Sequence, residues 1–254
     1  NIKEVVPCSD ISSARDVCLF VSYSPSFLVK KHVREHILAL RRNDVSVVLV
    51  VNVDNFDSCF EVDDELKSLL SGLYCRENHG YDFSAWSHLY SLLGEAMNPE
   101  RLYLVNDSIV GPLDQIMFDR MMARIRESKS EMVGLTSNSD SIWHLQSFFL
   151  VFGREILRCK EFRKFLSSLW SFPTKELVIL FYELRLTALV RSLGYKVEAL
   201  FDLDGKKFPE NNKTIFYPCE LYEAGFPFVK GALVGDDKIL KRFSSLGCDV
   251  RRFL

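Results

Sequence analysis

Polar side chains follow three apolar stretches of this chain, at the point where each stretch ends. Ser22, Tyr23 and Ser24 follow the first, Asn52 and Asp54 follow the second, and Asn106, Asp107 and Ser108 follow the third. If the stretches are parallel strands of one sheet, their carboxyl ends share an edge, and ligands of open parallel sheets bind there. Three such groups in succession favour a binding site over ordinary wet loops. Asp107 and Ser108 can also simply cap the turn before the sequence GPL.

A second group of polar residues occupies residues 76–86, RENHGYDFSAW, directly before a stretch with helical character. It holds two basic side chains, two carboxylates and an amide. Gly80 lies among them and fits a backbone position that needs a positive φ or a close approach to a ligand. The simplest alternative to a binding role is that Arg76 and Asp82 pair with each other across the turn.

Glu183 is a third candidate for chemistry. It lies three residues after Leu180 and three before Leu186, so helical spacing places it near an apolar face. A carboxylate in such a place is either paired or functional. Arg185, Arg191 or a distant cation could form the pair.

The elements that position these groups alternate along the chain. Apolar runs at residues 16–25, 44–54 and 100–108 predict buried strands, and the helical spacing of residues 27–42, 83–97 and 113–128 predicts helices between and after them. Further expected elements are a short helix at 62–73, strands at 131–138 and 195–202, a strand running into a turn or helix at 144–157, and a long helix at 174–194. This alternation favours a mostly parallel sheet covered by helices.

The bulk composition excludes several classes of protein. A net charge of −2 gives no electrostatic reason to expect a nucleic-acid partner. The seven cysteines form no CxxC pair, which indicates reduced thiols in the cytoplasm. No GxGxxG, Walker-type, HExxH or GxSxG motif occurs, and no apolar run reaches the ~18 residues that span a bilayer. Because the chain starts without Met, we expect it to be a piece of a longer, multidomain polypeptide.

Five blocks carry a resemblance to a known family: NHGYDFSAW, LVNDSIVGPL, GLTSN…WHLQSFFLVF, YELRLTALVRSLGY and FPFVK. In this order, over about residues 16–231, the chain resembles the rhamnan synthesis protein F family, rhamnosyltransferase-like proteins of bacterial surface polysaccharide assembly. The resemblance implies a GT-A-like, Rossmann-type α/β domain at residues 1–203. Residues 204–254 would form a C-terminal extension that packs on the same domain.

The resemblance also implies roles for individual residues. Glu183 would be the catalytic base, and Asp107 would act with it, as the one carboxylate left of a DxD-type metal motif. Since hard oxygen ligands suit Mg²⁺ or Mn²⁺, Asp107 is the candidate metal ligand, although a cation such as Arg76 can replace the metal. The donor-binding residues would be Ser22, Tyr23, Asn52, Arg76, Asn78, Gly80, Asp82, Asn106, Ser108 and Lys230, and the acceptor side would hold His144, Gln146 and Ser147.

The function implied is an inverting glycosyltransferase without a redox cofactor. It would move a sugar, L-rhamnose from dTDP-rhamnose, onto a growing polysaccharide or lipid-linked glycan of the O-antigen, capsule or rhamnan type; a UDP-linked donor is the other nucleotide sugar considered. We expect it in the cytoplasm, with peripheral contact at the inner face of the cytoplasmic membrane. The alternative is a non-catalytic GT-A-like module that binds glycan or nucleotide within a larger synthase.

Overall fold

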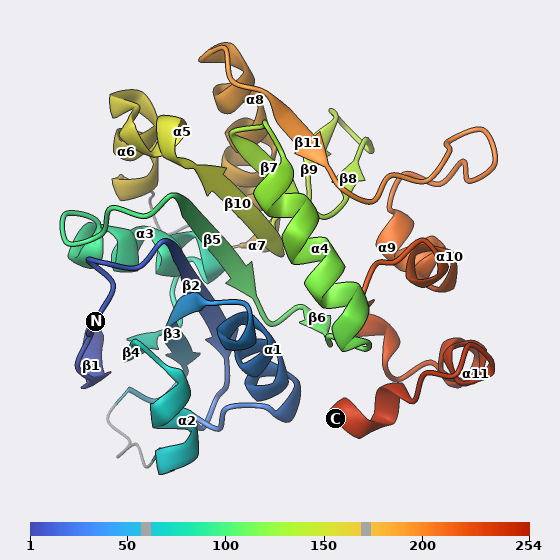
Figure 1. Ribbon diagram of the computed structural model, residues 1–254, viewed down its shortest axis with the longest axis horizontal. Helices are drawn as coiled ribbons and strands as arrows, with labels where there is room; N and C mark the ends of the chain where they lie inside the picture. Colours follow the sequence, from blue (N-terminus) through green and yellow to red (C-terminus); the bar gives the residue numbers. More distant parts are fainter. Residues whose placement is uncertain (57–61, 169–173) are drawn as a thin grey trace.

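A central sheet with helices on both faces organises the molecule (Figure 1). The computed structural model describes residues 1–56, 62–168 and 174–254. The sheet has eight strands in the order β1-β4-β3-β2-β5-β10-β7-β11. β1 and β10 run antiparallel to their neighbours, and the other six strands share one direction. The predicted single-domain, mostly parallel α/β fold is therefore confirmed.

The sheet strands are β1 (Ile2–Val6), β2 (Asp16–Tyr23), β3 (Val45–Val53), β4 (Gly72–Glu77), β5 (Arg101–Asn106), β7 (Met132–Gly134), β10 (Phe149–Gly153) and β11 (Val197–Ala199). Two small antiparallel pairs lie outside it: β6 (Ile109–Val110) with β12 (Val229–Lys230), and β8 (Ser137–Asn138) with β9 (His144–Leu145).

The helices are α1 (Lys31–Arg42), α2 (Asp64–Leu69), α3 (Tyr81–Leu93), α4 (Gln115–Glu127), α5 (Arg154–Arg158), α6 (Lys160–Ser167), α7 (Lys175–Val178), α8 (Leu184–Ser192), α9 (Lys213–Phe216), α10 (Pro218–Glu223) and α11 (Asp237–Ser245). A π-helical segment, Ile179–Glu183, joins α7 to α8, and Gly231–Leu233 and Val250–Phe253 are short 3₁₀ helices. No helix in the described ranges is long and apolar enough to cross a membrane.

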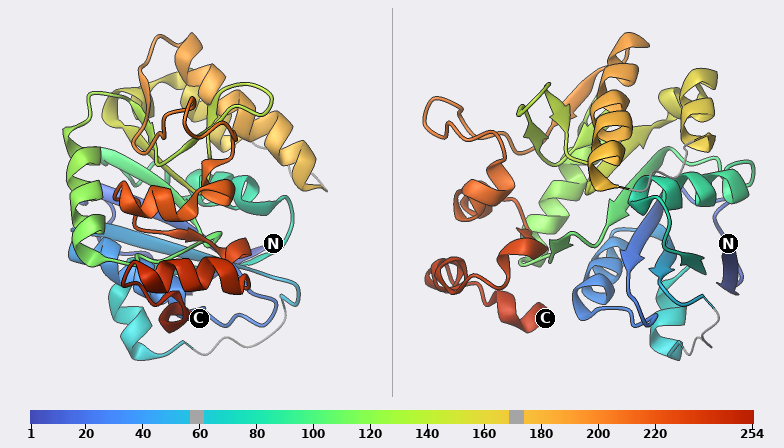
Figure 2. Two further views of the ribbon diagram at one scale, coloured as in Figure 1. Left: turned by 90° about the vertical axis from the view of Figure 1, so that its right-hand side faces the viewer. Right: turned by 180° about the vertical axis from the view of Figure 1, so that it is seen from behind.

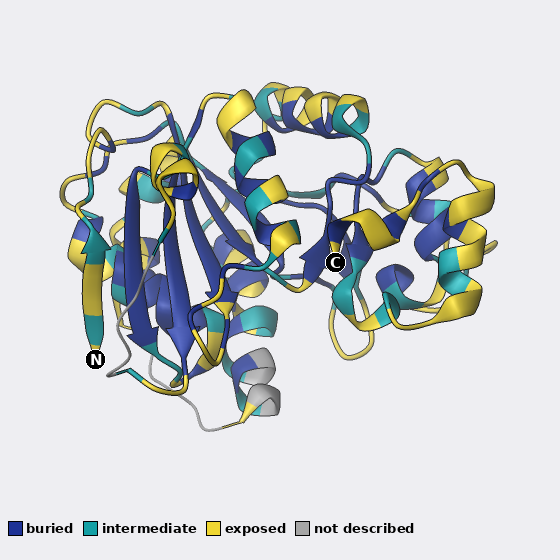
Figure 3. Cartoon of the chain, turned by 90° about the horizontal axis from the view of Figure 1, so that it is seen from below, coloured by how far each residue is buried: buried dark blue, intermediate teal, exposed yellow. Residues whose placement is uncertain are grey.

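Two buried layers sandwich the sheet, because alternate residues of a strand face opposite sides. In β2, Phe20 belongs to the cluster that holds α1, α2 and α4, whereas Leu19 belongs to the cluster that holds α3, α6 and α8. Figure 3 shows the central strands buried along most of their length. Since β2, β3 and β5 are covered on both faces, their continuous apolar sequences are explained.

The structure differs from the sequence expectations at several elements. β4 was missed, because its last residues, Arg76 and Glu77, are charged and resemble a turn. The edge strand β1 was also missed. The expected long helix at 174–194 is interrupted by the π-helical segment Ile179–Glu183, and its first residue, Thr174, follows the undescribed residues 169–173.

The C-terminal segment, residues 204–254, lies along one side of the sheet domain (Figure 2). β12 pairs antiparallel with β6, with Lys230 opposite Ile109. Phe226 and Phe228 belong to the same buried cluster as α1 and α4. A smaller cluster joins Val110 to Phe243 and other residues near the C-terminus. Pairing and burial together tie this segment to the end of β5.

A histidine is buried where this segment meets the sheet. His36 is 1% exposed, and neither of its ring nitrogens has a hydrogen-bond partner in the part of the chain that is described. Four phenylalanine rings surround it: Phe20, Phe118, Phe149 and Phe228, with ring centroids 4.8–5.9 Å away. Burial, aided by the charge of His32, lowers the pKa of His36 to about 3.

Acid should therefore destabilise the fold through His36. Its folded pKa lies below the unfolded value of ~6.5, so the stability due to the neutral ring is complete above that value and falls as the pH drops towards 3. At ~1.4 kcal/mol per pH unit, the loss at pH 5 is about 2 kcal/mol. Denaturant unfolding between pH 7 and pH 5 should show that the free energy of unfolding falls more steeply with decreasing pH for the wild type than for His36→Leu. An equal fall in the two proteins would contradict the role given to His36.

Candidate functional site

A polar cleft of about 650 Å³ opens beside the carboxyl end of β5. β2 connects through α1 to β3 on one side, while β5 pairs with β2 on the other side. The chain thus reverses its winding between β2 and β5, and such a switch point is where open α/β sheets bind ligands. Its lining residues are Asp82, Asn106, Ser108, Asn138, Asp140, Ser141, His144, Gln146, Ser147, Phe148, Glu183, Leu184, Asn212, Ile215, Lys230, Gly231 and Ala232.

A chain of hydrogen bonds organises the β5 side of the cleft. Asp82 Oδ2 accepts a bond from Asn106 Nδ2 at 2.6 Å. Asn106 Oδ1 accepts from both the backbone N–H (3.1 Å) and the hydroxyl (2.7 Å) of Ser108. Lys230 Nζ donates to Ser108 Oγ at 3.3 Å and lies 4.2 Å from the centroid of the Phe148 ring. These four predicted site residues therefore meet, and the C-terminal segment supplies the cation.

Glu183 lines the same cleft at the end of the π-helical segment. Its Oε1 accepts a bond from the backbone N–H of Ser147 at 2.9 Å. No ion pair of Glu183 occurs among the described residues, since Arg185 lies over the Phe181 ring and Arg191 over the Trp143 ring. A π-helical turn rotates the residues that follow it relative to a regular α-helix, and such turns are frequent at functional sites.

The expected acceptor-side residues also line the cleft. His144 Nδ1 lies 2.7 Å from the carbonyl oxygen of Ile142. A carbonyl can only accept, so Nδ1 is the donor in this contact. Gln146 Oε1 accepts from the hydroxyl of Thr136 at 2.7 Å. His144, Gln146 and Ser147 thus share one cavity with Glu183.

Asp107 does not line the cleft but lies beside it, in a network of its own. Its Oδ2 accepts from Ser22 Oγ (2.9 Å), from the backbone N–H of Tyr23 (3.1 Å) and from Lys30 Nζ (2.7 Å). The Tyr23 hydroxyl donates to Asp54 Oδ2 at 2.7 Å, and Asn78 Nδ2 lies 3.5 Å from Asp54 Oδ1. This Asp107 network, made of Ser22, Tyr23, Lys30, Asp54, Asn78 and Asp107, covers the carboxyl ends of β2 and β3.

Arg76 was expected to bind the donor, but its hydrogen bonds are internal. Its guanidinium donates to the carbonyl oxygens of Glu77 (3.1 Å) and His79 (2.7 Å), to Asn52 Oδ1 (3.3 Å) and to Ser84 Oγ (2.8 Å). The side chain is buried, and desolvation lowers the pKa of Arg76 to about 10. Arg76 and Asn52 therefore hold the turn before α3 in shape.

The glycine of this turn has the backbone conformation that the sequence analysis expected. Gly80 has φ +73° and directly precedes α3. Asp82 in the first turn of α3 faces the cleft. The run of polar residues at 76–86 thus contains an internal brace around Arg76, one residue of the Asp107 network, Asn78, and one cleft residue, Asp82.

The described side chains near Asp107 do not complete a metal site by themselves. Within residues 1–56, 62–168 and 174–254, no three His, Cys, Asp or Glu side chains group so that they could hold a metal ion. One oxygen of Asp107 already accepts three hydrogen bonds, one of them from the cation of Lys30. We therefore derive no step that passes through a metal at Asp107.

Several cleft residues were missed by the sequence analysis. Asn138 ends β8, Asp140 and Ser141 lie in the turn between β8 and β9, and Asn212 and Ile215 lie at α9. The sequence NSDS has the composition of an ordinary turn, and ENNK lies in the polar stretch where the C-terminal extension was expected to begin. NSDS follows the strand expected at residues 131–138, but its polar residues were not assigned to the site. ENNK does not directly follow an expected strand, so the strand-end rule could not find Asn212.

The strand order, with antiparallel β10 between β5 and β7, and the polar cleft at the switch point are consistent with a GT-A-like α/β protein. The rhamnan synthesis protein F family model matches residues 48–241. The chain belongs to this family, which associates it with polysaccharide synthesis.

The chain is also similar to individual proteins. It is 29% identical over 131 residues to uncharacterized protein y4gN of Sinorhizobium fredii, a match that covers 50% of this chain and 34% of that protein. It is 26% identical over 230 residues to virulence protein VirA of Vibrio anguillarum, covering 78% of this chain and 72% of that protein. The chain thus spans about a third of the first relative's length and almost three quarters of the second's.

Proposed function

We propose that the protein is an inverting glycosyltransferase of bacterial surface polysaccharide synthesis, with L-rhamnose from dTDP-rhamnose as the transferred sugar. The observation that carries the proposal is that Glu183 shares one cleft with Lys230 and with the Asp82–Asn106–Ser108 chain. In one cavity, a carboxylate can take the proton of the acceptor hydroxyl and a cation can stabilise the leaving diphosphate. The membership in the rhamnan synthesis protein F family supports the choice of sugar.

The donor would bind with its diphosphate near Lys230. The departing nucleoside diphosphate gains negative charge as the glycosidic bond breaks, and a preorganised cation stabilises that charge. Asp82, Asp140 and Glu183 also line the cavity, so Lys230 marks the end where a diphosphate is least repelled. The nucleoside would extend towards the Asp107 network, where Tyr23 and Asn78 offer polar contacts beside β2 and β3.

Glu183 would act as the general base. It takes the proton of the acceptor hydroxyl while that oxygen forms a bond to the anomeric carbon and the bond from that carbon to the diphosphate oxygen breaks. The N–H of Ser147 holds Oε1 in place, so the carboxylate is oriented before the acceptor arrives. Attack opposite the leaving group inverts the anomeric configuration.

The second candidate is a non-catalytic module that binds glycan or nucleotide within a larger polysaccharide synthase. It is favoured by the pairing of Asp107 with Lys30, because a paired carboxylate offers little to a donor-bound metal. Such a module would bind sugars or nucleotides in the same cleft without transferring them. A transfer assay separates the two candidates.

A thermal-shift series with dTDP, UDP and GDP, each with Mg²⁺ and with EDTA, tests the proposal. We expect dTDP or UDP to stabilise the wild type. Since a hydrogen bond to a charged group contributes ~1.5–3 kcal/mol, Lys230→Ala should weaken the binding of that nucleotide by at least about tenfold. Lys238→Ala, which changes an exposed lysine of α11, should bind it like the wild type. Absence of stabilisation by every nucleotide would contradict the donor site.

A further inference from the structure

The C-terminal segment brings one more polar side chain to the cleft, that of Asn212, directly before α9. An asparagine in that place commonly caps the helix with its side-chain oxygen. Asn212 does not: its side chain makes no cap bond to the helix. The side-chain amide of Asn212 is therefore free of a capping role and makes other contacts.

The hydrogen bonds of Asn212 fix which way its amide points. Oδ1 accepts from Thr214 Oγ1 at 2.9 Å and from Gln146 Nε2 at 3.3 Å. Nδ2 has no partner in the described ranges 1–56, 62–168 and 174–254. With its oxygen turned towards Thr214 and Gln146, Asn212 has two N–H donors left for the cleft.

Two buried threonines match this orientation. Thr136 Oγ1 donates to Gln146 Oε1 at 2.7 Å, so the NH₂ group of Gln146 faces Asn212. The hydroxyl of Thr214 lies 2.9 Å from Asn212 Oδ1 and 3.4 Å from Gln146 Oε1. Because it has a single proton, it donates to the nearer oxygen, that of Asn212. Thr136 and Thr214 are 0% and 1% exposed. A rotated Asn212 amide would set donor against donor in a buried place.

We propose that Asn212 binds a sugar hydroxyl oxygen at the Gln146 corner of the cleft, and that Thr136 and Thr214 are its positioning residues. A neutral donor within a cavity that also holds Asp140 and Glu183 suits an uncharged oxygen better than a phosphate, which Lys230 would bind. The proposal rests on the proposed transferase function. The hydroxyl belongs either to the donor sugar or to the acceptor glycan, and the experiment distinguishes them.

The test compares Asn212→Ala, Thr214→Val and Thr214→Ser with the wild type. Thr214→Val keeps the shape of the side chain and removes the hydroxyl, whereas Thr214→Ser keeps the hydroxyl. One hydrogen bond corresponds to about a threefold to tenfold change, so Asn212→Ala and Thr214→Val should raise KM by that factor for a single substrate. A higher KM for the nucleotide sugar assigns the donor, and a higher KM for the glycan assigns the acceptor. Stabilisation by dTDP should be unchanged in all variants.

Four results would overturn the inference. Wild-type KM values for both substrates in Asn212→Ala would remove Asn212 from sugar binding while leaving the transferase intact. Equal losses in Thr214→Val and Thr214→Ser, or a loss of dTDP binding in Asn212→Ala, would show a general structural role. A wild type that binds dTDP and transfers no sugar would instead overturn the proposed function, and this inference with it.

Discussion

Glu183→Gln should lower sugar transfer by about 10²- to 10⁴-fold, the usual contribution of a general base, while dTDP binding should stay close to the wild-type value. Glutamine has the shape of glutamate and an oxygen that can still accept from the N–H of Ser147, so the cleft keeps its form. It cannot take a proton from the acceptor hydroxyl. The loss should therefore appear in kcat and not in the stabilisation by nucleotide.

Glu155→Gln provides the matched control, because Glu155 is an exposed carboxylate of α5 that lies outside the cleft. It should keep full transfer. If Glu183→Gln transferred sugar at the wild-type rate, Glu183 would not be the base. Parallel loss of transfer and of dTDP binding would make Glu183 part of the donor site.

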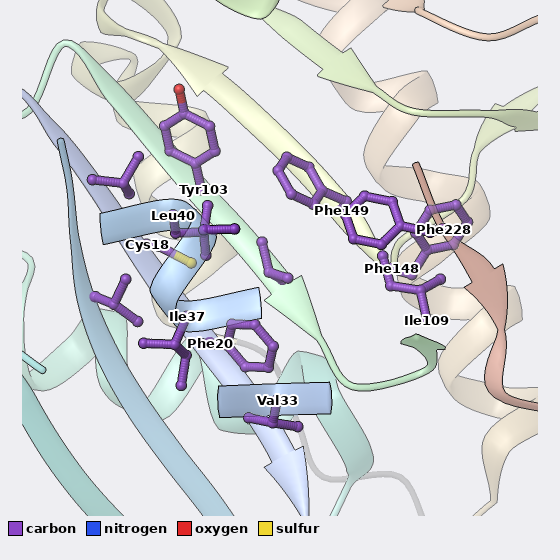
Figure 4. Packing of buried hydrophobic residues seen from close by; sticks show 14 of the residues in the cluster. Cys18, Phe20, Val33, Ile37, Leu40, Tyr103, Ile109, Phe148, Phe149 and Phe228 are labelled. Carbon is purple, nitrogen blue, oxygen red and sulfur yellow. The ribbon is translucent and has the colours of Figure 1, made fainter. Parts of the chain in front are cut away.

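Phe228→Ala should lower the free energy of unfolding by about 3–5 kcal/mol. Phe228 is fully buried and lies against His36, Phe149 and Phe226, with ring centroids at 4.8, 6.4 and 5.7 Å. Figure 4 shows it among the aromatic side chains of the main core. Removing the ring leaves a cavity at the junction between the C-terminal segment and the sheet. Chemical denaturation measures the loss.

Phe216→Ala makes the same chemical change at a residue of the same segment that is 54% exposed. It should change the unfolding free energy by much less, since surface substitutions usually stay within ~0.5 kcal/mol. Equal destabilisation by the two variants would mean that the Phe228 contacts do not hold the segment in place.

The strands at the centre of the sheet could be predicted from the sequence because burial on both faces requires continuous apolar runs. β2, β3 and β5 each show such a run, and each ends in polar residues. The helices α1 and α4 show the spacing of one buried face. Of the three carboxylates on which the sequence argument depended, Asp82 and Glu183 share the cleft and Asp107 lies outside its lining.

What the sequence could not show depends on contacts between distant residues. Lys30 pairs with Asp107, 77 positions further along the chain, and no local sequence pattern indicates that pair. Arg76 has the residue type of a phosphate ligand, but folding buries it against internal carbonyl groups. Asn212 reaches the cleft only because the C-terminal segment turns back to pair β12 with β6.

The pairing of β12 with β6 has a consequence for engineering. Two polar cleft residues, Lys230 and Asn212, come from a stretch of about fifty residues that contributes no strand to the eight-stranded sheet. A chimera that carries this stretch from a relative would exchange part of the ligand contacts while leaving the scaffold unchanged. Under the proposed function, exchanging residues 204–254 between relatives should alter the sugar preference.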